Sequence, residues 1–201
     1  PKVFIQDYMI QLKDGSDNIV AGHIKLNGAT KKQNVDIHFP ELGYSESVEV
    51  SANGIGNFEF QVDDLELWSP DNTKLYAVKI ESQMDLVEDQ IGFRNISTQG
   101  DQMFLNGEPL FLRGICIHEE NPIRGDRAFS EEDARILLTW AKELNCNFVR
   151  LAHYPHNEYM VRLADEMGIM VWEENPVYWT ILWNNQSTFQ NAKNQIGRAH
   201  V

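Results

Sequence analysis

The hydrophobic periodicity of the chain changes near Gly92, and this change constrains the fold more than any other feature. Before Gly92, apolar and polar residues alternate at every second position, which is typical of strands with one buried face. Gly, Asn, Asp and Pro separate these runs, and no segment keeps a 3.6-residue period. Residues 1–91 therefore predict an antiparallel sandwich of immunoglobulin-like type. The runs that predict its strands are "HIKLN", "NVDIHF", "SVEVSA", "NFEFQV" and "KLYAVKIES".

Residues 92–201 alternate instead between strand and helix patterns. "MFLNGEPLFLRGICIH" predicts a hairpin around Asn106-Gly107, whose second strand continues toward His118. "SEEDARILLTWAKELN" predicts a helix that Ser130 caps, with Asp133 at the capping-box position. One face of this helix is apolar and consists of Ala134, Leu137, Leu138, Ala141 and Leu144.

The rest of this half continues the alternation. "NFVRLA" predicts a buried strand, and "NEYMVRLADEM" predicts a helix that ends at Gly168. "IMVW" then predicts a third strand, and "STFQNAKNQIG" one more helix. This order indicates parallel β/α units, in either a barrel or a doubly wound sheet. No Gly-rich phosphate loop follows the first strand, which weakens the dinucleotide-binding interpretation.

All three predicted parallel strands end in polar, ionisable residues. In a (β/α)₈ barrel the active site lies at these carboxyl ends of the strands. We therefore expect a functional site where the three ends meet. The residues at these ends are His118-Glu119-Glu120, His153-Tyr154-Pro155 and Glu173-Glu174-Asn175.

His118 and His153 have several possible roles: catalytic bases, metal ligands, hydrogen-bonding groups for a polar ligand, or structural residues. Two histidines and a carboxylate would suit zinc. The chain nevertheless lacks the HxH and HExxH spacings, so we expect no metal. Two histidines at strand ends, with a carboxylate pair at a third, favour a functional site over a structural role.

Arg150 lies inside a predicted buried strand, where an unpaired cation would cost several kcal/mol. We expect it to pair with Glu173 or Glu174 on the neighbouring strand. The pair could be an internal ion pair that stabilises the barrel, or it could keep a carboxylate ionised and oriented beneath a substrate. One pair can have both roles. Because Glu173 and Glu174 are adjacent in a strand, they point to opposite faces and cannot form a glycosidase carboxylate pair.

The second half of the chain also contains a group of aromatic residues and two cysteines. Aromatic rings near the strand ends suit either a core or sugar stacking; they are Tyr154, Trp172, Tyr178, Trp179 and Trp183. Cys116 and Cys146 fall at opposite ends of parallel strands, so we expect no disulfide between them.

Charge and hydropathy exclude two classes of partner. The net charge is -13 and no basic stripe is visible, so we expect no nucleic-acid binding. No run of about 18 apolar residues exists, so we expect no membrane insertion. The chain begins Pro1-Lys2-Val3-Phe4 without an initiator Met, and we expect it to be an internal piece of a longer protein. Its compartment stays open.

The stretch "GFRNI…FLNGEPLFLRGICIHEENP…NCNFVRLAHYPHNEYMVRLADEMGIMVWEENPVYW" resembles family 2 of the glycoside hydrolases, which contains β-galactosidases, β-glucuronidases and β-mannosidases. The resemblance covers residues 92–183 and also accounts for the preceding sandwich. It implies a β plus α/β fold. Residues 1–91 would form an immunoglobulin-like β-sandwich, and residues 92–201 the first part of an incomplete (β/α)₈ TIM barrel.

The resemblance also implies a retaining exo-β-glycosidase that hydrolyses terminal β-linked sugars. The family's acid/base and nucleophile glutamates end the fourth and seventh barrel strands, so both are expected beyond residue 201. The chain would then hold no catalytic residue and be inactive alone. The resemblance assigns His118, His153, Tyr154 and Glu174 to substrate binding, and Arg150 to support beside the site.

Subfamily features favour a β-galactosidase-like parent, with a β-glucuronidase as the alternative. "HEENPIRG" and "LADEMGI" look like β-glucuronidases and smaller metal-independent β-galactosidases, and His118-Glu119 argues against mannosidases. Tyr178 and Thr180 occupy the positions of the family's magnesium ligands, so no metal and no cofactor is expected. The expected partner is an oligosaccharide or glycoside, and an oligomer of the parent stays open. A different class, a non-catalytic carbohydrate-binding fragment, also remains.

Overall fold

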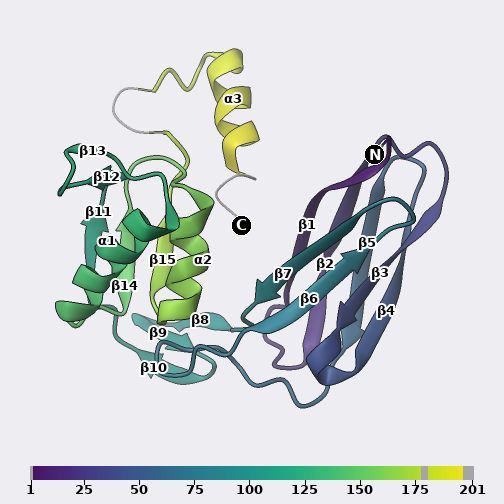
Figure 1. Ribbon diagram of the computed structural model, residues 1–201, viewed down its shortest axis with the longest axis horizontal. Coiled ribbons are helices and arrows are strands. Elements are labelled where there is room, and N and C mark those ends of the chain that lie inside the picture. Colours follow the sequence, from purple (N-terminus) through teal and green to yellow (C-terminus); the bar gives the residue numbers. More distant parts are fainter. Residues whose placement is uncertain (1, 178–180, 197–201) are drawn as a thin grey trace. The chain divides into compact units, whose positions relative to one another are not determined.

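The computed structural model describes residues 2–177 and 181–196 (Figure 1). The chain divides into two compact units, Pro1–Leu110 and Phe111–Val201. The domains expected from the sequence, 1–91 and 92–201, place the boundary earlier, and we retain them as a proposal. Within the described residues, no helix has the length and apolar character needed to cross a bilayer.

The first unit contains an antiparallel β-sandwich, as the sequence predicted. One sheet has the strand order β1-β2-β5 and the other has the order β4-β3-β6-β7. A short 3₁₀ helix, η1 (Pro40–Leu42), connects two of the strands. The strands are β1 (Phe4–Leu12), β2 (Ile19–Asn27), β3 (Gln33–Phe39), β4 (Tyr44–Val50), β5 (Ile55–Gln61), β6 (Tyr76–Glu81) and β7 (Leu86–Ile91).

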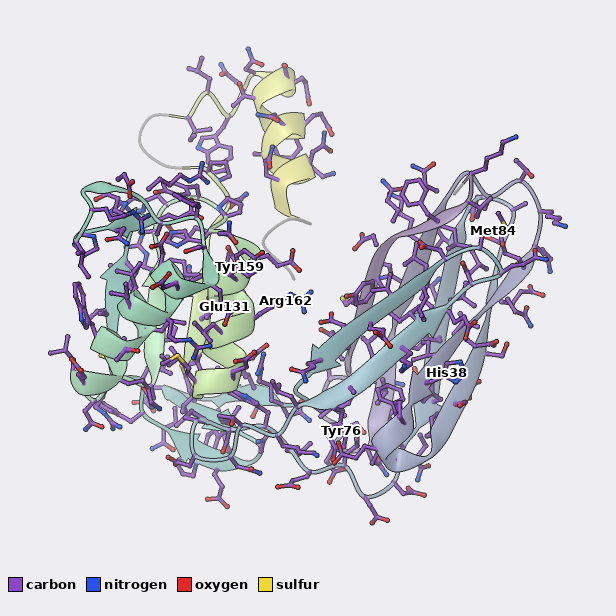
Figure 2. The ribbon with its side chains drawn as sticks, viewed as in Figure 1. His38, Tyr76, Met84, Glu131, Tyr159 and Arg162 are labelled. Carbon is purple, nitrogen blue, oxygen red and sulfur yellow. The ribbon has the colours of Figure 1, made fainter. Side chains whose placement is uncertain are left out.

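Alternate residues of the strands form the sandwich core. Val35, Ile37 and Phe39 on β3 are fully buried, while the residues between them face outward. Tyr76, labelled in Figure 2, is 2% exposed, and its hydroxyl accepts a hydrogen bond from the Glu66 N–H at 2.8 Å. Burial of this tyrosine therefore leaves its polar atom satisfied.

Two strands, β1 and β7, are absent from the runs that the sequence analysis identified. In β1 the register with β2 shifts between Ile5 and Asp7, so the alternation is interrupted within the strand. β7 lies at the edge of its sheet, and its residues are half-buried or exposed. An edge strand needs less apolar surface, which weakens its signal in the sequence.

A small antiparallel sheet follows the sandwich, formed by β8 (Ile96–Gln99), β9 (Gln102–Leu105) and β10 (Glu108–Leu110). The predicted hairpin at Asn106-Gly107 is confirmed. Both turn residues have positive φ, 53° and 83°, as a type I′ turn requires. The Asn106 side chain donates to the Trp68 carbonyl and accepts from the Asn95 N–H, both at 2.9 Å. These bonds fix the hairpin to the rest of the first unit.

The prediction that the second hairpin strand continues to His118 is wrong. β10 ends at Leu110, and β11 (Gly114–Ile117) belongs to another sheet. The Asn147 side chain donates to the Phe111 carbonyl at 3.0 Å and accepts from the Arg113 N–H at 2.8 Å. This amide holds the connecting residues beside the start of the next parallel strand, so the chain leaves the hairpin sheet.

The second unit shows the predicted β/α alternation. β11, β14 (Phe148–Leu151) and β15 (Met170–Glu173) are parallel and adjacent in that order. The helices α1 (Glu131–Glu143) and α2 (Glu158–Met167) connect these strands and lie side by side against the sheet (Figure 1). A further helix, α3 (Gln186–Ile196), follows later in the unit.

The strands and helices of the second unit share one core. Its members include Ile117, Val149 and Leu151 from the strands, Leu138 from α1 and Leu163 from α2. Each of these strand residues lies on the helix-facing side of the sheet, so the intervening residues face the other way.

Leu144 is an exception to the predicted apolar face of α1, because it is 67% exposed. This residue is the C-cap of α1, with φ -80° and ψ 6°. The chain has left the helical path there, so the 3.6-residue period no longer places the side chain on the buried face. The outer faces of the helices carry ion pairs one turn apart, such as Glu131–Arg135 and Glu158–Arg162 (Figure 2).

The start of α1 organises the loop that precedes it. Ser130 caps the helix and accepts a hydrogen bond from the Asp133 N–H at 3.2 Å, as predicted. The Asp133 carboxylate, with 1% exposure, accepts from Arg124 at 2.5 and 3.0 Å. It also accepts from the Asn121 amide at 2.6 Å and the Phe129 N–H at 3.0 Å. One buried carboxylate thus ties the loop to the helix.

This loop also contains a short antiparallel ribbon, β12 (Glu120–Asn121) and β13 (Asp126–Arg127). Its residues are continuous with the end of β11, so the position of the ribbon affects the residues that follow that strand. The Asp133 contacts therefore support the strand end indirectly.

We predict that Asp133→Asn lowers stability most at neutral pH. Hydrogen bonds from Arg124 hold the pKa of Asp133 well below its ordinary value. A depressed folded-state pKa contributes stability that is fully present above the unfolded value of about 3.9, decreases below that value, and is lost as pH falls through the lower folded-state pKa. The difference in Tm between wild type and Asp133→Asn should therefore be large at pH 7 and smaller at pH 3.

Asp126→Asn is the matched control, because Asp126 also pairs with Arg124 but is 54% exposed. An exposed pair contributes little, so this variant should melt close to wild type at both pH values. Equal melting of Asp133→Asn and wild type at pH 7 would contradict the prediction.

We predict that Asn106→Gly destabilises the first unit by about 1–3 kcal/mol, since it loses two hydrogen bonds while keeping the positive φ. Asn106→Ala should lose roughly 1–2 kcal/mol more, because alanine also strains in the left-handed region. Urea unfolding monitored by tryptophan fluorescence measures both. Equal stability of Asn106→Gly and Asn106→Ala would show that the positive φ at residue 106 does not strain alanine.

Candidate functional site

The parallel register places the ends of the three strands side by side. Ile117, Leu151 and Glu173 are partners across β11, β14 and β15. The residues that follow them are His118, Ala152-His153 and Glu174, so the expected site residues meet at one edge of the sheet.

Arg150, His153 and Glu174 form one connected cluster. The Arg150 Nε donates to Glu174 Oε1 at 2.7 Å, and His153 Nδ1 lies 3.1 Å from Glu174 Oε2. The predicted pairing of Arg150 with a carboxylate of the third strand is confirmed, and the partner is Glu174. The hydrogen bond from Arg150 holds the pKa of Glu174 below its usual value, so this carboxylate is ionised at neutral pH.

The ionised Glu174 decides which nitrogen of His153 carries the proton. A carboxylate only accepts hydrogen bonds, so His153 Nδ1 must donate to it. Arg150 Nη2 lies 3.3 Å from the same Nδ1. Two donors cannot share a hydrogen bond, so this approach is a contact only. A neutral ring that donates from Nδ1 carries its lone pair on Nε2.

His118 lies beside this cluster. Its ring meets that of His153 edge to face, with ring centres 5.4 Å apart and an angle of 75°. Cys116 precedes His118 by two residues, and its Sγ is 3.8 Å from Arg150 Nη1. Cys116 and Cys146 are both free thiols, as expected. The two histidines, the arginine and Glu174 thus form one hydrogen-bonding surface.

Arg150 is less buried than its strand suggested. Its side chain is 39% exposed, because it lies on the face of the sheet opposite the helices. Its register partners Cys116 and Trp172 are also exposed. The expectation of a fully buried cation is therefore corrected: β14 has one buried face, which Val149 and Leu151 form, and one accessible face.

Tyr154 takes a position that the sequence did not predict. Its ring stacks on that of His156, with centres 5.3 Å apart and an angle of 28°. His156 is 8% exposed, and its Nε2 lies 3.0 Å from the Ala152 carbonyl. Burial lowers the pKa of His156, so its ring is neutral. The position of the Tyr154 ring therefore depends on a second histidine, the buried His156.

Glu119 and Glu173 form a second acidic group behind the strand ends. Glu119 is 3% exposed, pairs with Arg127 at 2.6 Å and accepts a hydrogen bond from the Asn157 N–H. Glu173 accepts from the His156 N–H at 2.9 Å, and burial raises its pKa to about 6. The sequence analysis considered Glu173 as a partner of Arg150, but it gave no role to Arg127, His156 or Asn157.

One sequence signal does assign Glu173 to this side. It follows Val171 at a spacing of two, so the strand period places it on the helix-facing side of β15. No comparable signal exists for Glu119 and His156, because both lie in loops and their partners are distant in sequence. Glu173 Oε1 and Glu119 Oε1 accept hydrogen bonds from the N–H groups of His156 and Asn157, so these two carboxylates hold the backbone just before α2.

The described residues contain no group of three or more His, Cys, Asp or Glu side chains arranged to hold a metal ion. Tyr178 and Thr180, the positions compared with magnesium ligands, lie outside the described residues, as does Trp179. Trp172 and Trp183 are exposed, at 59% and 61%.

Comparison with known proteins places this geometry in a family. The family model "Glycosyl hydrolases family 2, TIM barrel domain" matches residues 96–200, and "Glycosyl hydrolases family 2" matches residues 3–94. A β-galactosidase of Thermoanaerobacterium thermosulfurigenes is 35% identical over 145 residues, which are 67% of this chain and 20% of the relative. A β-glucuronidase of Paenibacillus borealis is 30% identical over 193 residues, which are 90% of this chain and 31% of the relative.

Solved structures agree on the fold. A family 2 β-galacturonidase from Eisenbergiella tayi, bound to galacturonate, has a TM-score of 0.82 at 24% identity and covers 99% of this chain and 38% of its own. The chain spans a third or less of the length of the two curated relatives named above. The sandwich, the parallel strands and the two family models together show that this chain belongs to family 2 of the glycoside hydrolases.

Proposed function

We propose that the whole protein is a retaining exo-β-glycosidase that hydrolyses terminal β-linked sugars, most closely a β-galactosidase. The observation that carries this proposal is the surface that His118, His153, Arg150 and Glu174 form at the ends of the parallel strands. In a TIM barrel this edge faces the active site. Histidine and carboxylate groups are suitable partners for sugar hydroxyls.

The role of the chain in this reaction is to bind and orient the sugar. Glu174 is held ionised by Arg150 and in turn fixes the His153 ring through its Nδ1–H. Fixed hydrogen-bonding groups place the substrate for reaction without further ordering. Tyr154 adds an aromatic wall, which suits the apolar face of a sugar ring.

The bond cleavage requires groups that these residues do not supply. A retaining glycosidase uses two carboxyl groups about 5–5.5 Å apart on either side of the glycosidic bond. Glu173 and Glu174 engage different partners on opposite faces of β15. The family resemblance implies that the acid/base and nucleophile glutamates end the fourth and seventh barrel strands, and we propose that the rest of the protein supplies them.

A β-glucuronidase is the second candidate, because the relative that covers 90% of this chain carries that name. Recognition of a uronate requires a cation for its carboxylate. The cation in this cluster, Arg150, is already paired with Glu174. A uronate would therefore need a cation from another part of the protein.

We predict that the full-length protein hydrolyses an aryl β-galactoside faster than the matching β-glucuronide, and that the 201-residue chain alone hydrolyses neither. The chain lacks the two catalytic carboxylates, so release of nitrophenol should stay at the uncatalysed rate. Preference for the glucuronide would select the second candidate. Absence of turnover on every aryl β-glycoside, together with sugar binding by the chain, would instead indicate a non-catalytic carbohydrate-binding protein.

We predict that His153→Ala and Arg150→Ala act differently in the full-length protein. His153→Ala should lower kcat/KM roughly 10- to 100-fold, since one or two hydrogen bonds to the sugar are lost, and should keep the wild-type Tm. Arg150→Ala should also lower the Tm by roughly 2–4 °C, because it leaves the partly buried Glu174 without its cation.

Arg135→Ala is the control for the second variant. Arg135 also pairs with a glutamate, Glu131, but both side chains are more than half exposed. This variant should melt and react as wild type does. A wild-type Tm for Arg150→Ala would overturn its assignment as a support of the site.

A further inference from the structure

Two carboxylates, the buried Glu119 and the half-buried Glu173, hold the segment 152–157, which carries His153 and Tyr154. Glu173 Oε1 accepts a hydrogen bond from the His156 N–H at 2.9 Å. Glu119 Oε1 accepts one from the next N–H, that of Asn157. Ionised acceptors make hydrogen bonds roughly twice as strong as neutral ones. The ends of β15 and β11 thus fix two consecutive peptide groups at the start of α2.

The segment is also closed on itself. His156 Nε2 lies 3.0 Å from the Ala152 carbonyl. A carbonyl oxygen only accepts, so Nε2 carries the proton of this neutral ring. Its Nδ1 is buried and has no hydrogen-bond partner among the described residues. The closure fixes the His156 ring, and that ring supports Tyr154 by stacking. A shift of the His156 backbone would therefore move both Tyr154 and His153.

We propose that Glu173 is a positioning residue that sets the place of His153 and Tyr154 against the sugar by holding the His156 peptide group. The inference rests on the proposed function and adds to it a residue on the opposite face of β15 from Glu174. Glu173 acts through the backbone and does not touch the substrate. It therefore governs how tightly the sugar binds and leaves the chemical step to other groups.

Glu173 is a better test position than Glu119. Glu119 also binds Arg127, by its Oε2 at 2.6–2.7 Å. Its removal would disturb β13 as well as the segment 152–157. Substitution of Glu173 changes the contact with His156 while leaving the Glu119–Arg127 pair in place.

Protonation of Glu173 offers an independent way to weaken the contact. Burial raises the pKa of Glu173 to about 6, and the charge on Glu119 contributes in the same direction. Glu119, His118 and Arg127 are the charged or titratable groups that act on His156, and Arg150 and Glu174 contact His153 in the same segment. The carboxylate is ionised at pH 7.5 and protonated at pH 5, where it is a weaker acceptor. The hold on the His156 N–H should therefore weaken as pH falls.

The kinetic test uses the full-length protein and an aryl β-galactoside at pH 7.5. Loss of one charge-assisted hydrogen bond in Glu173→Ala should raise KM about ten-fold and leave kcat within about two-fold. Glu173→Gln should raise KM by less than Glu173→Ala does, because its neutral amide oxygen still accepts from the His156 N–H, although more weakly than a carboxylate. Glu166→Ala, an exposed glutamate on α2, is the control and should match wild type. A fall in kcat at constant KM, or an unchanged Glu173→Ala, overturns the proposal.

Hydrogen–deuterium exchange of the His156 amide in the same protein gives a readout that needs no turnover. Its protection factor should fall about ten-fold in Glu173→Ala and by a smaller factor in Glu173→Gln. It should also fall between pH 7.5 and pH 5 in wild type but not in Glu173→Gln. If Glu173→Ala does not fold, the pH comparison of wild type with Glu173→Gln decides, and equal behaviour of the two overturns the proposal.

The two measurements separate this inference from the proposed function. If the wild-type protein shows no turnover, the proposed glycosidase function is wrong. The exchange rate of the His156 amide then still shows whether Glu173 holds the segment 152–157. An active wild type whose His156 amide exchanges equally in all variants removes the positioning role alone.

Discussion

The in-register pairing of β11, β14 and β15 is the constraint on which the rest of the second unit depends. Ile117, Leu151 and Glu173 share one row, so the strands end together and their next residues meet. The same pairing sorts the side chains, with Val149 and Leu151 against the helices. A shift of β14 by one residue would exchange these apolar residues with Arg150. The burial of an arginine against α1 and α2 would be prohibitive, so the core fixes the site as well.

Two adjacent glutamates show how strongly the local environment determines the behaviour of one residue type. Glu174 faces Arg150, whose hydrogen bond lowers its pKa. Glu173 faces the buried start of α2, where loss of solvent raises its pKa to about 6. One side of β15 therefore carries a permanent charge that fixes His153. The other carries a carboxylate that titrates near neutral pH and holds the backbone. The strand period of two is enough to separate these roles.

The sequence predicted those features that depend on neighbouring residues. Asn106-Gly107 specifies its turn by conformation, Ser130 caps α1 through a contact three residues away, and Gly168 ends α2. The predicted Arg150 ion pair follows from the cost of burying a charge next to a strand that ends in glutamates. Each of these signals lies within one element or one neighbouring strand.

Features that depend on distant partners were not predicted. Glu119 binds an amide 38 residues away, and its own surroundings give no sign of that contact. The end of the hairpin at Leu110 depends on Asn147, and the bulge in β1 hides the alternation that would have identified the strand. Leu144 matched the helical period, but the helix ended before it. The roles of the site residues remain proposals, because position alone does not show what a side chain binds.

The contacts of Asn106 have a consequence for how the sandwich and the hairpin sheet of the first unit can diverge in sequence. Its side chain binds the Trp68 carbonyl and the Asn95 N–H, and its own N–H binds the Asn95 carbonyl. All three partner groups belong to the main chain, so they are present whatever side chains those positions carry. Sequence drift in the sandwich therefore leaves this junction intact as long as the backbone path persists. Because one asparagine makes all these hydrogen bonds to main-chain groups, chimeras that exchange sandwiches between relatives should retain them.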